Sequence, residues 1–222
     1  MFKLMMSDYA AKPLDYFDGA RADIVAKLPD DSSATILEIG CGNGSTGAIA
    51  KAQGKCARYV GIDLDEKAAT AAREAIDLVL LGNVEEIELE SLGGPFSAAI
   101  LSEVLEHLID PWKLLGRVND VIRPGGLILA SSPNIANMRL IRQLLRNRFD
   151  YTSAGVMDRT HLRWFTSATF REMFENAGFE TLSVGPLISP SPKWRVLNAV
   201  SGNAFAHLAS SQIMYCGRKP GG

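Results

Sequence analysis

Short apolar runs alternate with segments of helical periodicity along most of the chain. The runs are nearly continuous in apolar side chains, which favours strands that are buried on both faces of a sheet. The expected strands are residues 34–40, 57–63, 77–82, 96–102 and 127–133, and the expected helices are 45–52, 66–75 and 111–122. Because strands that alternate with helices are typical of βαβ units, the pattern predicts a doubly wound α/β fold with a mostly parallel sheet.

Two segments interrupt this alternation. Residues 14–28 have apolar side chains at helical spacing behind Pro13, so we expect an N-terminal helical segment within residues 1–30. Residues 134–165 combine an arginine-bearing helical stretch with a polar, aromatic loop, and we expect them to form a lid inserted above the sheet. The chain then ends on an expected helix over 166–179 and two strands, 181–187 and 211–219. We expect a single domain over residues 1–222, with seven strands and an antiparallel last strand.

A glycine-rich turn follows the first expected strand, in the sequence LEIGCGNGSTG at residues 37–47. Gly40, Gly42 and Gly44 can adopt positive φ and allow a ligand to approach the backbone closely. Asp63 ends the next expected strand, where a carboxylate can accept hydrogen bonds from ribose hydroxyls. The turn and the acid together predict a nucleoside-binding site.

The charge beside the turn distinguishes two classes of nucleoside cofactor. Gly42, Gly44 and Gly47 also match the GxGxxG pattern of dinucleotide-binding proteins, so an NAD-dependent oxidoreductase is an alternative. A diphosphate favours neutral amides at a helix N-terminus, whereas Glu38 places a carboxylate there. A carboxylate attracts a cation such as the ammonium group of an amino-acid tail. This pattern favours S-adenosylmethionine, which has such a tail and no phosphate.

Residues 35–133 resemble class I S-adenosylmethionine-dependent methyltransferases, which have a Rossmann-like fold. The resemblance rests on the glycine turn, on the acid after the second strand, and on the sequence LSEVLEHLIDPWKLLGRVNDVIRPGG. It implies that Glu38 holds the methionine portion of the cofactor, that the turn passes beside it, and that Asp63 binds the ribose. The remaining cofactor-binding residues that we expect are Gly40, Cys41, Gly42, Gly44, Leu64, Asn83, Val84 and Ser102. Asn83 stands where the family often has an aspartate, and its amide oxygen can still accept a hydrogen bond from adenine.

A second resemblance concerns the methyl acceptor. Residues 158–180 are similar to a segment of bacterial methyltransferases that accompany glycosyltransferases in surface-polysaccharide and natural-product sugar pathways. This implies a sugar or small-molecule hydroxyl as the acceptor, or an amine, and a glycan as one possible partner. The sequence EVLEHL suggests the alternative of a quinone-precursor or phenol O-methyltransferase.

Two histidines are candidate catalytic bases. His161 lies in the expected lid, and His107 follows the fourth expected strand, near the edge of the sheet where ligands bind in α/β folds. Each can equally be a histidine with only a packing or surface role. Glu103, Glu106 and His107 have a spacing that, on a helix, would bring three ligands to one face with His161 as a fourth. We nevertheless expect no metal, because relatives with the EHL sequence act without one.

Charge and composition narrow the range of partners. Twenty-three basic and 25 acidic residues give a net charge of −2, which excludes a global electrostatic attraction to nucleic acid or to an anionic membrane, so any charged partner must be bound locally. Arg139, Arg142 and Arg146 share one predicted helical face, which is either solvated or a clamp for an anionic substrate. Three cysteines that are far apart in sequence argue against disulfides and zinc, so we expect a cytoplasmic protein without a membrane span. The oligomeric state stays open.

Overall fold

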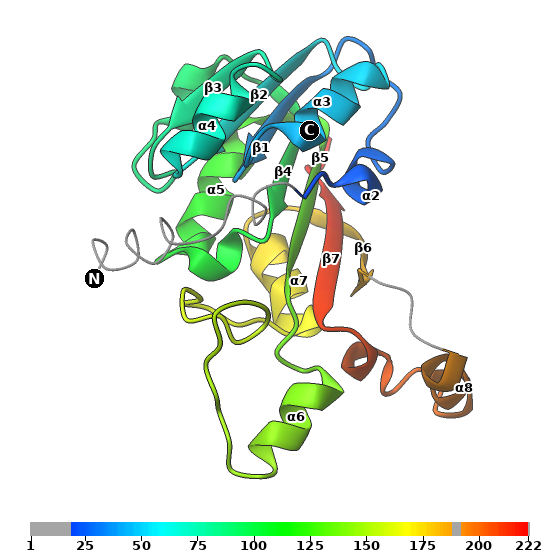
Figure 1. The fold of residues 1–222 in the computed structure, drawn as a ribbon. Helices are drawn as coiled ribbons and strands as arrows, with labels where there is room; N and C mark the ends of the chain where they lie inside the picture. The colour runs from blue at the N-terminus through cyan, green and yellow to red at the C-terminus, as the bar shows by residue number, and fades with distance from the viewer. Residues whose placement is uncertain (1–18, 188–191, 222) are drawn as a thin grey trace.

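The predicted apolar runs form one seven-stranded sheet (Figure 1). The computed structural model describes residues 19–187 and 192–221. The strands are β1 (Thr35–Ile39), β2 (Arg58–Asp63), β3 (Leu78–Leu81), β4 (Phe96–Ser102), β5 (Ile122–Pro133), β6 (Glu180–Pro186) and β7 (Gln212–Arg218). The helices are α2 (Ala22–Val25), α3 (Ser45–Ala52), α4 (Glu66–Ala72), α5 (Pro111–Val121), α6 (Met138–Leu144), α7 (Ser167–Asn176) and α8 (Pro192–Val200). Short 3₁₀ helices are η2 (Leu89–Leu92), η3 (Leu105–His107) and η4 (Ala206–Ala209).

The strand order is β3-β2-β1-β4-β5-β7-β6. Strands β1 to β5 pair in parallel, and β1 lies between β2 and β4 with Leu37 opposite both Val60 and Ala99. The last strand, β7, is antiparallel to both of its neighbours, β5 and β6. The prediction of a mostly parallel α/β sheet with an antiparallel last strand is therefore confirmed. This order reverses direction between β1 and β4, where ligands bind in open α/β sheets.

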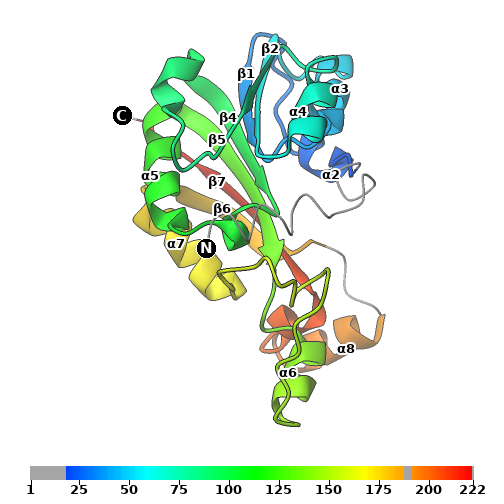
Figure 2. The ribbon, with the colours of Figure 1, turned by 60° about the vertical axis from the view of Figure 1, so that its left-hand side comes forward.

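Helices cover both faces of the sheet. Alternate side chains of β1 contact the helices of one face or of the other. Leu37 and Ile39 belong to a core cluster with residues of α5 and α7, whereas Ile36 belongs to a second cluster with residues of α2, α3 and α4. Successive side chains of a strand point to opposite faces, so a continuous apolar run supplies both clusters. Figure 2 shows α5 and α7 on one side of the sheet and α2, α3 and α4 on the other.

Two predicted boundaries differ from the structure. The expected helix over 14–28 lies partly outside the described residues, and its described part is helical only in α2, before the chain turns towards Pro29. A proline disfavours helical backbone at the residue before it, so Pro29 excludes Leu28 from the helix. The predicted turn RPGG instead lies within β5, because Gly125 and Gly126 exchange backbone hydrogen bonds of 2.9 Å with Lys219 at the end of β7.

Two segments project from the same end of the sheet in both views (Figures 1 and 2). One contains α6, which follows β5, and the other contains α8 and η4, which precede β7. Asn134 links the two segments where they leave the sheet, since its side-chain amide donates to the carbonyl oxygens of His207 (2.7 Å) and Ser210 (2.9 Å). Among the described residues, no helix is long and apolar enough to cross a membrane.

Candidate functional site

The glycine turn connects β1 to α3 with a backbone that only glycine adopts without strain. Gly40, Gly42 and Gly44 have φ values of +73°, +54° and +80°, in the left-handed region. A Cβ atom on Gly40 would lie 2.5 Å from Cγ2 of Val104, so a side chain there would displace the segment that follows β4. The turn therefore leaves an open backbone surface at the carboxyl end of β1.

Asp63 connects the end of β2 to this turn. One carboxylate oxygen accepts from the backbone amide of Gly42 (2.7 Å), and the other accepts from the amide of Asp65 (2.9 Å). Burial raises the pKa of Asp63, and these two amides act in the opposite direction because they stabilise the ionised form. The carboxylate is thus held in one orientation at the edge of the turn.

Glu38 is a buried carboxylate in the middle of the same region. Its side chain is 2% exposed, and the hydroxyl of Tyr59 donates to Oε2 at 2.9 Å. Burial raises the pKa of Glu38 to about 8, because the charged form loses its hydration. A cationic group bound beside Glu38 would restore the charged form, so the site suits an ammonium ligand and disfavours an anionic one.

One cavity of about 590 Å³ joins these groups, a volume typical of sites for small molecules and cofactors. Nine of the ten expected cofactor-binding residues line it, together with both candidate catalytic histidines: Glu38, Gly40, Cys41, Gly42, Asp63, Leu64, Asn83, Val84, Ser102, His107 and His161. Gly44 does not line the cavity. It instead begins α3 with a left-handed backbone and packs against Ala72.

Arg21 is a cavity residue that sequence reasoning missed. Its guanidinium donates to the hydroxyls of Ser102 and Ser131, and it pairs with Asp23 through two nitrogens at 2.8 and 2.9 Å. With Nε and Nη2 on Asp23 and Nη1 on the two hydroxyls, one N–H of Nη2 is left to donate to a ligand carboxylate. No motif or spacing signals Arg21, because it lies 81 residues from Ser102 in sequence.

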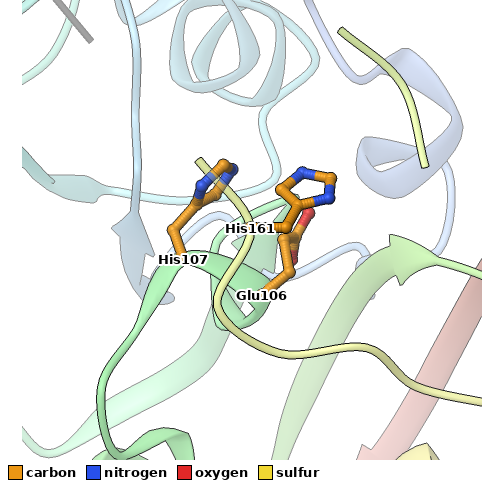
Figure 3. Close-up of side chains that lie close together, drawn as sticks. All are labelled: Glu106, His107 and His161. Atoms are coloured by element: carbon orange, nitrogen blue, oxygen red, sulfur yellow. The ribbon is translucent and has the colours of Figure 1, made fainter. Parts of the chain in front are cut away.

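Figure 3 shows that Glu106, His107 and His161 converge, although His161 comes from the inserted segment. The ring centroids of the histidines are 4.7 Å apart, and one ligand-type atom from each of the three side chains lies within 4.8 Å of the others. The backbone holds them together, since the amides of Leu162 and Arg163 both donate to the carbonyl oxygen of Glu106, at 2.8 and 3.0 Å. These three side chains have the right chemistry to hold a metal ion.

The two imidazoles have defined tautomers. Nδ1 of His107 lies 3.2 Å from the carbonyl oxygen of Thr160, and Nδ1 of His161 lies 3.1 Å from that of Val156. A carbonyl oxygen only accepts, so both Nδ1 atoms carry the proton, and Nε2 of a neutral ring has the lone pair. Such an Nε2 can accept a proton or bind a metal ion.

The acidic residues of this segment are arranged differently from the helical spacing that we expected. Glu103 has a φ of +55° and lies outside η3, so it does not share a helical face with Glu106 and His107. Burial, followed by the nearby Glu103 carboxylate, raises the pKa of Glu106 well above its usual range. The hydroxyl of Ser132 donates to Oε2 of Glu106 at 3.2 Å.

The rest of the inserted segment contributes little to the cavity. Only Gly155, Val156 and His161 of residues 134–165 line it. The basic residues Arg139, Arg142, Arg146 and Arg148 are exposed and do not line it, so the structure does not support their interpretation as a substrate clamp. The aromatic residues Phe149, Tyr151 and Trp164 contact one another, with centroids 5.5 to 6.2 Å apart.

Comparison with known proteins identifies a family. A family model described as a methyltransferase domain matches residues 15–184. The chain is 29% identical over 147 residues to a probable S-adenosylmethionine-dependent methyltransferase of Mycolicibacterium smegmatis, covering 65% of this chain and 51% of that protein. It is 30% identical over 128 residues to a ubiquinone biosynthesis O-methyltransferase of Xylella fastidiosa, covering 55% and 51%. The chain thus spans about half the length of these curated relatives.

A solved structure of similar fold agrees with this match. The S-adenosylmethionine-dependent methyltransferase of Archaeoglobus fulgidus superposes with a TM-score of 0.65 at 20% identity, covering 92% of this chain and 97% of that chain. At this identity the likeness shows the fold alone. The family match favours S-adenosylmethionine over the nicotinamide alternative, in agreement with the buried Glu38. The chain therefore belongs to the methyltransferase-domain family and carries a class I S-adenosylmethionine-dependent methyltransferase domain.

Proposed function

We propose that this chain transfers a methyl group from S-adenosylmethionine to a hydroxyl group of a small molecule or a sugar unit of a glycan. An amine is the alternative acceptor. The observation that carries the proposal is that Glu38 and Asp63 share one cavity with His107 and His161. A cation-binding acid and a ribose-binding acid thus lie in the same enclosure as two potential bases.

The residues around the glycine turn fit the parts of the cofactor. Glu38 pairs with the ammonium group, and Arg21 binds the carboxylate of the same amino-acid tail. Asp63 accepts from the ribose hydroxyls. Apolar and amide groups around the adenine position come from Leu64, Asn83 and Val84, all of which line the cavity. When bound, S-adenosylmethionine supplies an electrophilic methyl group on a sulfonium.

The opposite wall of the cavity holds the acceptor. His161 removes the proton of the acceptor hydroxyl through Nε2, and His107 is the second candidate for this role. Residues 134–165 act as a lid, of which Gly155 and Val156 close over the acceptor and exclude water. In this arrangement the chain mainly aligns the acceptor oxygen with the methyl group.

A second candidate function is metal-assisted O-methylation of a phenol or quinone precursor. The cluster of Glu106, His107 and His161 favours it, because these side chains can hold a divalent cation beside the acceptor. A bound cation lowers the pKa of a phenol hydroxyl. Loss of activity on dialysis against a chelator, restored by Mg²⁺ or Zn²⁺, would support this candidate over the histidine base.

The state of the cysteines supports a cytoplasmic location. Cys41, Cys56 and Cys216 are all unpaired, which fits a reducing compartment such as the cytoplasm.

Two measurements test the proposal. We expect S-adenosylhomocysteine to raise the melting temperature of the chain and NAD to leave it unchanged. In the second measurement, the chain is incubated with methyl-labelled S-adenosylmethionine and, separately, with pools of sugars, phenols and amines. Label should appear in a pool whose members bear hydroxyl groups, the sugars or the phenols. Protection by S-adenosylhomocysteine without transfer to any pool would contradict the enzymatic role and leave only cofactor binding.

A further inference from the structure

The two projecting segments carry a surface whose composition the catalytic proposal does not use. We define the projecting surface as residues 138–151, which contain α6, and residues 192–207, which contain α8. Seven of the 12 large apolar side chains exposed in the described chain belong to it: Leu144, Leu145, Phe149, Tyr151, Val196, Val200 and Phe205. Leu145 and Val200 are 82% and 83% exposed. Exposing these apolar side chains to water has an unfavourable free energy, which contact with an apolar partner would remove.

Positive charge is concentrated on the same surface. The projecting surface has six basic residues and one acidic residue: Arg139, Arg142, Arg146, Arg148, Lys193 and Arg195, with Asp150. The remaining 17 basic and 24 acidic residues give the rest of the chain a net charge of −7. The net charge is therefore unevenly distributed, with +5 on the segments that project beyond the sheet (Figures 1 and 2) and −7 on the rest of the chain.

We propose that the projecting surface binds the surface of an anionic phospholipid bilayer. Basic residues interleaved with exposed leucine, valine and aromatic side chains are the composition of segments that lie in the headgroup region of a membrane. The arginines and Lys193 would contact phosphate groups, while Leu145 and Val200 would enter the acyl boundary. The acidic remainder of the chain would face away from the membrane, so electrostatics also orient the molecule.

Two other partners fit this surface less well. A second copy in a two-fold symmetric dimer would place the same six basic residues opposite themselves, and their mutual repulsion opposes that contact. A nucleic acid would pair with the arginines but would leave Leu145, Val196 and Val200 in water, since a phosphate backbone offers no apolar surface to aliphatic side chains.

The two projecting segments leave the sheet beside the cavity. Pro133, Leu187 and Ser211 line the cavity, and each lies at the base of one projecting segment. A membrane beneath the projecting surface would therefore lie near the acceptor side of the cavity. If the proposed methyl transfer holds, this placement favours an amphiphilic acceptor with a lipid tail; the membrane binding itself does not depend on that function.

Vesicle co-sedimentation tests the proposal without any methyl acceptor. We expect the full chain to bind vesicles of mixed phosphatidylglycerol and phosphatidylcholine, and to bind pure phosphatidylcholine vesicles at least tenfold more weakly. Rising salt should weaken the binding, because it screens the charges. Each basic residue near an anionic membrane contributes about fivefold to binding, so R142Q/R146Q should reduce it about 25-fold.

Matched variants separate charge from apolar insertion. L145N/V200N keeps every charge, and we expect it to lower vesicle binding at least tenfold. K67Q/R73Q makes the same change of charge on and just after α4, at the opposite end of the molecule (Figure 1), and should bind as the unmodified chain does. All substituted positions are exposed, so melting temperatures should be unchanged.

Three outcomes would overturn the proposal. The first is equal binding to neutral and anionic vesicles, and the second is equal loss of binding in K67Q/R73Q. The third is absence of vesicle binding together with a dimer in solution that L145N/V200N dissociates, which would make the projecting surface a contact between copies. Binding can be lost or retained in these tests whether or not the chain transfers methyl groups, so the failure of one proposal is distinguishable from failure of the other.

Discussion

The glycine turn and the two histidines lie on the same cavity, but contacts of different range hold them in place. Around the turn, Asp63 accepts from the amide of Gly42, and the glycines themselves set the backbone direction. Across the cavity, His107 is oriented by the carbonyl oxygen of Thr160, 53 residues away, and His161 reaches it from the inserted segment. Apart from Arg21, the proposed cofactor side thus depends on backbone geometry around the turn, whereas the proposed acceptor side depends on how a long insertion returns to the sheet.

This difference predicts that the two sides can be damaged separately. His161→Ala should lower kcat by about 10²- to 10⁴-fold, the usual contribution of a general base, and leave affinity for S-adenosylhomocysteine unchanged. Single-turnover rates and calorimetric binding measure the two effects. His207→Ala is the matched control, because His207 is exposed on η4 and does not line the cavity. A fall in cofactor affinity equal to the fall in kcat would show that the sides are not independent.

The complementary change is on the cofactor side. Asp63→Ala removes the ribose partner and the acceptor for the amide of Gly42, so we expect affinity for S-adenosylhomocysteine to fall by more than about 100-fold, as for the loss of two hydrogen bonds to a charged group. Asp77→Ala is a suitable control, since Asp77 also accepts from a backbone amide, that of Tyr59, but does not line the cavity. Unchanged affinity in Asp63→Ala would contradict our placement of the ribose.

Glu38 should make cofactor binding depend on pH. Burial raises its pKa to about 8, so below that pH the empty site holds a proton that a bound ammonium group displaces. Affinity for S-adenosylhomocysteine should therefore rise with pH, by at most about tenfold per unit, and level off near pH 8. Glu38→Gln should abolish this slope when affinity is measured by calorimetry across the range. A slope that persists in Glu38→Gln would assign the proton to another group.

The same shift affects stability in a defined direction. The folded chain holds the Glu38 proton more tightly than the unfolded chain does, so unfolding releases a proton between the ordinary glutamate pKa and about 8. The free energy of unfolding should fall as pH rises through this window, and denaturant titrations should show a weaker fall in Glu38→Gln.

The smallest effect concerns Cys41, which lies within the turn but is 5% exposed, and whose pKa burial raises strongly. Thiol-alkylating reagents should leave activity intact, because a buried thiol with a raised pKa is a poor nucleophile. Cys41→Ala should lower the free energy of unfolding by about 1 kcal/mol, measured by urea titration. Rapid inactivation by alkylation, prevented in Cys41→Ala, would show that the thiol is reactive.

Sequence patterns predicted that Glu38, Gly40 and Asp63 would lie together, and these residues do line one cavity, because they are close together along the chain. Gly40, Glu38 and Asp63 occupy consecutive βα units, and a parallel sheet brings the carboxyl ends of neighbouring strands together. Arg21 was missed, because its contacts with Ser102 and Ser131 follow from tertiary packing and no spacing signals them. The proximity of His161 to His107 was proposed only as part of a ligand set. The helical spacing of Arg139 and Arg142 favoured a solvated face over a substrate clamp, and both residues are exposed.

The two ends of the inserted segment, residues 134–165, are held together by backbone hydrogen bonds, and this matters for protein engineering. The backbone amide of Ile135 donates to the carbonyl oxygen of Phe165 at 3.0 Å. Shortly before Phe165 in sequence, the amides of Leu162 and Arg163 donate to the carbonyl oxygen of Glu106. These bonds use only main-chain atoms, so they do not depend on which side chains lie between them. The part of this segment that does not line the cavity, residues 136–151, is thus an exchangeable module: a different sequence there would leave Gly155, Val156 and His161, and the proposed methyl-donor site, in place.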